Sequence, residues 1–178
     1  MPKLAALTVS VGVLAVLATW IFRLDAAAAM KLQVWQAFIA WGCHFHCGGK
    51  FTGFRNATVC MIFGALVGMA AVMLSSYLGA FGGLAVPVAV GIGAAVICLA
   101  SALPLLAAIP ASVYGFAAIA GLIILGKALD PVNGVTPTQA ILPTAISIVI
   151  GSLFGIVSEY LAGALSKKDA PAAAGAAA

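Results

Sequence analysis

The stretch NATVCMIFGALVGMAAVMLSSYL, residues 56–78, contains no charged side chain and is long enough to cross the hydrocarbon core of a bilayer as one helix. The whole chain shares this character, since 65% of its 178 residues are hydrophobic, 7% are charged and its mean hydropathy is +1.23. Soluble domains carry about 25% charged residues to cover a water-facing surface. The sequence therefore predicts an integral membrane protein and excludes a soluble domain.

Five further apolar stretches flank residues 56–78. Together the six stretches predict an all-α, polytopic membrane helix bundle of about six spans, over residues 4–22, 32–47, 56–78, 84–103, 105–126 and 139–162. The first follows Lys3 as a signal peptide would, but Arg23 and Asp25 stand where a cleavage site would need small residues, so we interpret it as a retained span. The second is short, so either its helix extends into its flanks or it is re-entrant. Residues 1–165 form the transmembrane domain, and we expect a disordered tail over 166–178.

Basic residues occur mainly singly, near the ends of the apolar stretches, which is the distribution of topology signals rather than of a nucleic-acid surface. If six spans are present, both termini share a side with Lys50 and Arg55. That side then carries five of the eight basic residues, against three on the other. The positive-inside rule places both termini in the cytoplasm.

The two halves of the chain have the same layout, three apolar stretches each. The glycine pairs Gly64/Gly68 and Gly151/Gly155 both fall in the third stretch of their half, 87 positions apart. Because three spans is an odd number, the second half would enter the membrane inverted, as in many channels and transporters. These glycines also predict close helix packing, either within one chain or between subunits.

The densest group of chemically active residues is WGCHFHCGGK, residues 41–50. On a helix, Cys43, His46 and Cys47 share a face, and thiolate and imidazole are preferred ligands of zinc and copper. A metal site there would need a further ligand, from another element or another subunit. A disulfide between cysteines four apart on one helix is geometrically poor. His44 and His46 could instead line a pore, or lie at a helix end among the lipid headgroups.

Polar groups elsewhere are few. Pro110 interrupts the fifth stretch and would kink it, ahead of Ser112 and Tyr114. Glu159 lies near the end of the last span, where it could reach the interface or pair with Arg55 or a tail lysine. No arrangement of nucleophile, base or phosphate loop is present, so we expect no enzyme and no obligatory cofactor.

Several of these motifs resemble a known family. Trp41-Gly42-Cys43 with Cys47-Gly48-Gly49, then residues 109–115 (IPASVYG), then residues 151–155 (GSLFG), are similar to the YcdZ-like bacterial inner-membrane proteins, which form domain-of-unknown-function family 1097. The resemblance covers about residues 32–165. It implies a multi-pass protein of the bacterial inner membrane and no assigned activity.

Our leading hypothesis is an inner-membrane channel or facilitator for a small, mostly uncharged solute, built as a homo-oligomer, because charges that could couple an ion are nearly absent from the spans. The predicted pore-lining residues are Trp41, His44, His46, Gly48, Gly49, Pro110, Ser112 and Tyr114. The alternative is a membrane protein that transports nothing and binds a metal or organises partner proteins.

Overall fold

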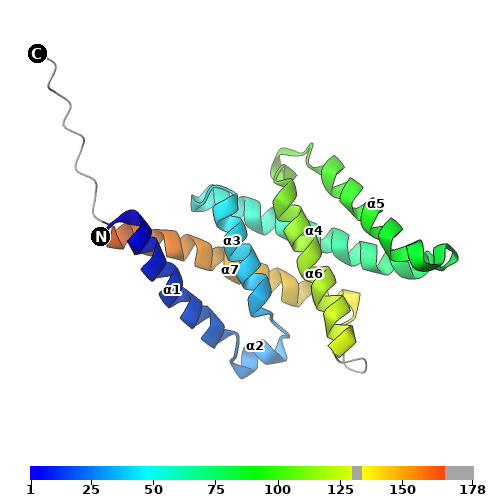
Figure 1. Cartoon of the computed structure of the whole chain (residues 1–178), viewed down its shortest axis with the longest axis horizontal. Helices are drawn as coiled ribbons and strands as arrows, with labels where there is room; N and C mark the ends of the chain where they lie inside the picture. The colour runs from blue at the N-terminus through cyan, green and yellow to red at the C-terminus, as the bar shows by residue number, and fades with distance from the viewer. Residues whose placement is uncertain (130–133, 167–178) are drawn as a thin grey trace, which may run out of the picture.

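The computed structural model describes residues 1–129 and 134–166, and the expected disordered tail lies outside them except for Ser166. All regular elements in this part of the chain are helical, as predicted. The helices are α1 (Lys3–Ile21), α2 (Asp25–Ala29), α3 (Val34–His46), α4 (Lys50–Tyr77), α5 (Ala85–Ala100), α6 (Ile109–Leu129) and α7 (Pro137–Leu165), with short 3₁₀ segments at Gly79–Leu84 and Pro104–Leu106 (Figure 1).

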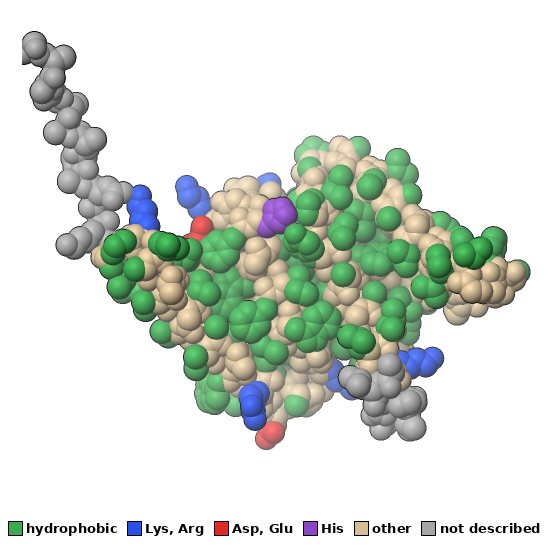
Figure 2. All heavy atoms as spheres, viewed as in Figure 1, with side chains coloured by type: hydrophobic (Ala, Val, Ile, Leu, Met, Phe, Trp, Pro, Cys, Tyr) green, Lys and Arg blue, Asp and Glu red, His purple; other side chains and the backbone are tan. Residues whose placement is uncertain are grey.

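Five segments are long and apolar enough to cross a membrane: Lys3–Ile21, Lys50–Tyr77, Gly79–Ala100, Ile109–Lys127 and Pro137–Leu165. Many large apolar side chains on them are exposed, including Leu4, Val16, Leu99 and Leu142. Figure 2 shows charged side chains along two opposite edges of one face, with hydrophobic side chains covering much of the area between them. An apolar belt between two charged edges is what a bilayer requires, so the chain is a multi-pass membrane protein.

The short helix α3 has 13 residues and spans about 20 Å at 1.5 Å per residue. It is therefore shorter than the hydrocarbon core of a bilayer and is not among the five long apolar segments. Its first residues share a hollow with Gly126 at the end of α6. Its last residue, His46, bonds Tyr114 near the start of α6. Because α3 runs alongside most of α6 in the opposite direction, it favours a sixth crossing over a re-entrant hairpin.

The N-terminus and the end of α7 lie at the same end of the bundle. The amino group of Met1 donates to the carbonyl oxygen of Leu165 over 3.3 Å, so the first residue of the chain touches the last turn of α7 (Figure 1). An even number of crossings brings the chain back to the face where it started. We call this face the terminal face, and the other one the loop face.

Several element boundaries differ from the prediction. α6 begins at Ile109, so Pro110 occupies its first turn, where the missing N–H costs little, and the predicted kink inside the span is wrong. α4 begins at Lys50 rather than Asn56, because Gly48 and Gly49 adopt positive φ values of 91° and 68° that end α3 and start α4 within one tight turn. The short helix α2 was not predicted.

In each of the halves α1–α3–α4 and α5–α6–α7, the first two helices pack against the third helix of the other half. α1 and α3 lie against α7, while α5 and α6 lie against α4, and α4 packs on α7 at the centre. α4 starts beside Glu159, near the end of α7, so these matching third helices run in opposite directions. The arrangement is that of two halves related by inversion.

Individual contacts repeat with the same offsets. A Cβ added at Gly64 would overlap the carbonyl oxygen of Ser112, and one added at Gly151 would overlap that of Ala37. Gly64 and Gly151 are 87 positions apart, and Ala37 and Ser112 are 75 apart. A second pair of contacts repeats in the same way: Gly68 approaches Ile119, and Gly155 approaches His44, with the glycines again 87 and their partners again 75 positions apart. The four predicted packing glycines thus lie at contacts within one chain, two in each half.

Candidate functional site

Polar side chains run along the contact between α3 and α7. Gln36, 0% exposed, donates from Nε2 to the carbonyl oxygen of Ala118 over 2.9 Å and to Thr144 Oγ1 over 3.1 Å. Nearer the loop face, the backbone N–H of Gln33 donates to Ser147 Oγ over 3.1 Å. These bonds tie the first half of α3 to α7 and α6.

The middle of this contact is held by Ser158 on α7. Its hydroxyl accepts from Trp41 Nε1 over 3.0 Å, and its carbonyl oxygen accepts from the Ser10 hydroxyl over 2.8 Å. The Trp41 ring is stacked between Phe38 and Phe154. α1, α3 and α7 therefore meet at one buried serine.

At the terminal face the contact ends in a hydrogen bond between a histidine and a carboxylate. His44 is fully buried, and its Nε2 lies 2.9 Å from Glu159 Oε2, on a side chain that is 32% exposed. The same carboxylate oxygen accepts the backbone N–H of Lys50, the first residue of α4, over 2.5 Å. A carboxylate accepts and cannot donate, so the His44 Nε2–H is the donor. The negative charge also lies at the positive end of the α4 helix dipole.

The turn before α4 is shaped around this carboxylate. A side chain at Gly49 would displace the Glu159 carboxylate, and the positive φ of this residue favours glycine. Lys50 also has a positive φ, 55°, which is uncommon for a residue with a Cβ.

We call the residues of this contact the polar seam. They are Gln33, Gln36, Trp41, His44, Thr144, Ser147, Ser158 and Glu159.

The matching positions in the other half are all apolar. Shifted by 75 positions, Gln36, Trp41 and His44 correspond to Ala111, Phe116 and Ile119 of α6. Shifted by 87, the four seam residues of α7 correspond to α4 residues Ala57, Cys60, Ala71 and Val72. Since α4 and α6 build the equivalent contact without polar side chains at these positions, the packing itself does not require the seam.

Some buried polar atoms of α3, α6 and α7 have no hydrogen-bond partner in the described part of the chain. They include Gln36 Oε1, His44 Nδ1, Ser112 Oγ and Ser152 Oγ. Unpaired polar groups are costly in an apolar interior, and at membrane depth they mark functional positions. Two of them belong to the seam.

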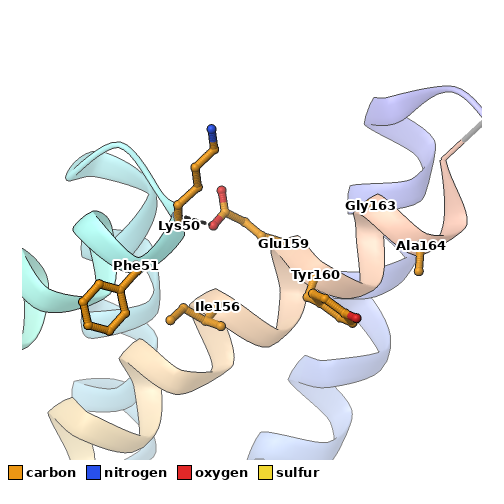
Figure 3. A pocket seen from close by; sticks show the side chains of 7 residues that line it. All are labelled: Lys50, Phe51, Ile156, Glu159, Tyr160, Gly163 and Ala164. Atoms are coloured by element: carbon orange, nitrogen blue, oxygen red, sulfur yellow. Dashed lines mark hydrogen bonds between the residues drawn. The ribbon is translucent and has the colours of Figure 1, made fainter. Parts of the chain in front are cut away.

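Hollows lie at the two ends of the seam. Near the loop face one of about 400 Å³ is lined by Lys31, Gln33, Trp35 and parts of α6. At the terminal face a groove of about 790 Å³ is lined by Lys50, Phe51, Ile156, Glu159, Tyr160, Gly163 and Ala164 (Figure 3). We call the second hollow the terminal groove.

The predicted pore-lining residues are distributed over several places. Trp41 and His44 belong to the seam, and Gly48 and Gly49 form the turn beside it. His46 Nδ1 lies 3.0 Å from the hydroxyl of Tyr114, on another side of α3.

The two remaining residues lie apart from the seam. Ser112 is buried where α6 crosses Gly64 of α4, and Pro110 is exposed at the start of α6. The structure therefore does not bring the eight predicted residues together around one space.

The predicted metal ligands do not form a cluster. Cys43 Sγ and Cys47 Sγ are 3.9 Å apart and free, while His46 is engaged by Tyr114. Within residues 1–129 and 134–166, no three His, Cys, Asp or Glu side chains converge closely enough to hold a metal ion.

The partner of Glu159 is His44, a pairing that was not predicted from the sequence. Arg55, one proposed partner, instead donates to Asn56 Oδ1. A usable signal was present in α7, where Thr144, Ser147, Gly151, Gly155 and Ser158 recur every three or four residues and so mark one helix face.

Comparison with known proteins gives one match. A family model described as "Protein of unknown function (DUF1097)" matches residues 8–163, most of the chain. The chain belongs to the DUF1097 family. No curated protein and no solved structure matches it. The DUF1097 region covers the whole polar seam and all or most of α1 and of α3 to α7, so the resemblance seen in the sequence is confirmed.

Proposed function

We propose that the protein is a channel or facilitator for a small, mostly uncharged solute, and that the solute passes along the polar seam. The observation that carries the proposal is that hydrogen-bonding groups follow the α3–α7 contact from one end hollow to the other, whereas the matching positions of the α4–α6 contact are apolar. A small solute that donates and accepts hydrogen bonds could exchange with these groups one after another.

The chemistry of the seam favours an uncharged solute. Its one carboxylate, on Glu159, is already engaged by His44 and by the N-terminus of α4. Gln36 and His44 each keep one unpartnered acceptor, eight positions apart, or about 12 Å along α3. Such acceptors suit a solute with hydroxyl or amide donors, and nothing in the seam supports enzymatic chemistry.

The location follows from the same reasoning. The resemblance to YcdZ-like inner-membrane proteins and the five-to-three distribution of basic residues predicted from the sequence favour the bacterial inner membrane with both termini in the cytoplasm. An oligomer remains part of the proposal.

The test is solute flux into proteoliposomes, followed by light scattering with water, glycerol and urea as probes. Wild type should exceed empty liposomes for at least one probe. The seam variant combines Gln36→Ala, His44→Ile and Thr144→Ala, each taken from the matching position of the other half, so each residue suits that packing. Its flux should fall to the level of empty liposomes.

A matched control, Ile119→Val, changes the position equivalent to His44 in the apolar half and should keep wild-type flux. The proposal is wrong if no probe exceeds empty liposomes. It is also wrong if the folded seam variant conducts like wild type. Stoichiometric zinc or copper that disappears on Cys43→Ser or Cys47→Ser, together with no flux, would support the metal-binding alternative.

A further inference from the structure

The terminal groove has one charged rim and apolar walls. Its lining comes from the first turn of α4, Lys50 and Phe51, and from the last three turns of α7. In Figure 3 the Lys50 side chain and the Phe51 ring extend to opposite sides, and Glu159 points toward the start of α4. The walls are formed by Phe51, Ile156 and Tyr160, and the first and last of these are 70% and 82% exposed.

The rim carries two opposite charges, on Lys50 and Glu159, whose side chains do not form a salt bridge with each other. Among the described residues the Glu159 carboxylate is hydrogen-bonded to His44, and no carboxylate lies within salt-bridge distance of the Lys50 ammonium. The hydrogen bonds from His44 and from the Lys50 backbone both go to Glu159 Oε2, so Oε1 keeps its accepting capacity. The rim thus offers one acceptor for a cationic N–H group and one ammonium for an anion.

The groove opens on the outer surface of α4 and α7, two helices long and apolar enough to cross the bilayer. The molecules that surround such a surface are phospholipids. Acyl chains suit the apolar and aromatic walls, and the charges at the rim suit a headgroup that carries both signs.

We propose that the terminal groove binds one zwitterionic phospholipid with a primary amine, of the phosphatidylethanolamine type. Its ammonium donates to Glu159, its phosphate pairs with the Lys50 ammonium, and its chains lie against Phe51, Ile156 and Tyr160. A trimethylated headgroup has no N–H to donate. An anionic headgroup places no cation against Glu159. The inference shares the groove with the proposed solute path but does not depend on transport.

The experiment is lipid titration of the delipidated protein in detergent, with bound lipids counted by native mass spectrometry. The probes are phosphatidylethanolamine, phosphatidylcholine and phosphatidylglycerol with identical acyl chains. Wild type should bind one phosphatidylethanolamine about tenfold more tightly than either of the others. Equal binding of all three would overturn the proposal, and so would preference for phosphatidylglycerol.

A groove-filling variant tests the location. A Cβ added at Gly163 meets nothing within 4 Å, so Gly163→Leu enters the groove without a clash inside the chain. The matched control is Gly91→Leu on α5, where a Cβ is equally unobstructed. Gly163→Leu should remove the tight site and Gly91→Leu should keep it. Identical binding by the two variants would contradict the proposed location.

Two charge variants test the headgroup contacts. Glu159→Gln should remove the preference for phosphatidylethanolamine over phosphatidylcholine, because the negative charge is lost while an acceptor oxygen for the Lys50 N–H remains. Lys50→Asn should weaken the binding of phosphatidylethanolamine and of phosphatidylcholine about equally, since asparagine tolerates the positive φ and only the phosphate contact is removed. An unchanged preference in folded Glu159→Gln would contradict the proposed amine contact. Because lipid binding is measured without solute flux, a negative result would contradict the lipid proposal and leave the channel proposal untouched.

Discussion

Gly64→Ala is expected to separate α4 from α6. The added Cβ would lie 2.5 Å from the carbonyl carbon of Ser112 and 2.8 Å from its Cα, and it would overlap the carbonyl oxygen. Ordinary van der Waals contact begins near 3.4 Å, so the two backbones must move apart by at least roughly 0.6 to 0.9 Å. A gap of this size weakens the surrounding dispersion contacts, and overpacking of this kind costs about 1–3 kcal/mol.

The inverted repeat makes the same prediction for Gly151→Ala, whose Cβ would lie 2.6 Å from the carbonyl carbon of Ala37 and 2.7 Å from its Cα. Gly91→Ala is the matched control because a Cβ there meets nothing within 4 Å. It should be neutral or stabilising by up to about 1 kcal/mol through helix propensity.

The assay is reversible unfolding in mixed micelles titrated with SDS, followed by circular dichroism. Gly64→Ala and Gly151→Ala should each lower the folding equilibrium constant by roughly 5- to 150-fold, which corresponds to the expected 1–3 kcal/mol. The reasoning is refuted if either variant unfolds within about 0.5 kcal/mol of Gly91→Ala, the usual scatter of neutral surface changes.

Three further substitutions should change the free energy of unfolding, measured by the same SDS titration. Thr136→Ala should lose about 1 kcal/mol, since Thr136 and Gln139 form a capping box at the start of α7, and an unchanged midpoint would contradict that cap. Glu159→Gln should lose about 1–2 kcal/mol because the bond from His44 loses its anionic acceptor, and a gain in stability would argue against that charge-assisted bond. Ser10→Ala should lose only about 0.6 kcal/mol, the average for a hydrogen bond between membrane helices, and a loss above about 2 kcal/mol would mean that Ser10 does more than bond to α7.

The fold class and the rough positions of the spans could be predicted from the sequence, because a long apolar run without charge has few alternatives to a membrane helix. Helix ends were less predictable where polar residues continue a helix. Lys50 to Arg55 looked like a loop, yet these residues form the first turns of α4, since Gly49 and Glu159 satisfy its N-terminus. Pro110 looked like a kink only because the start of α6 was placed too early.

The candidate site was only partly predictable. Trp41 and His44 were identified from their local cluster, but their partners Ser158 and Glu159 lie more than a hundred positions later. Pairing of this kind depends on how α3 packs against α7, which residue spacing within α3 does not encode. The repeat could be recognised from the layout of the apolar stretches. The difference between the polar seam and the apolar residues at the matching positions could be recognised only from the contacts between helices.

The most direct test of the account is the location of single cysteines in a cysteine-free chain, labelled in intact cells with a membrane-impermeant maleimide. Positions 1, 50 and 166 should share one accessibility, and positions 31 and 127 should share the opposite one, as six crossings require. If positions 31 and 50 were labelled from the same side, α3 would not cross the bilayer. The inverted repeat and the solute path along α3 would then both be contradicted.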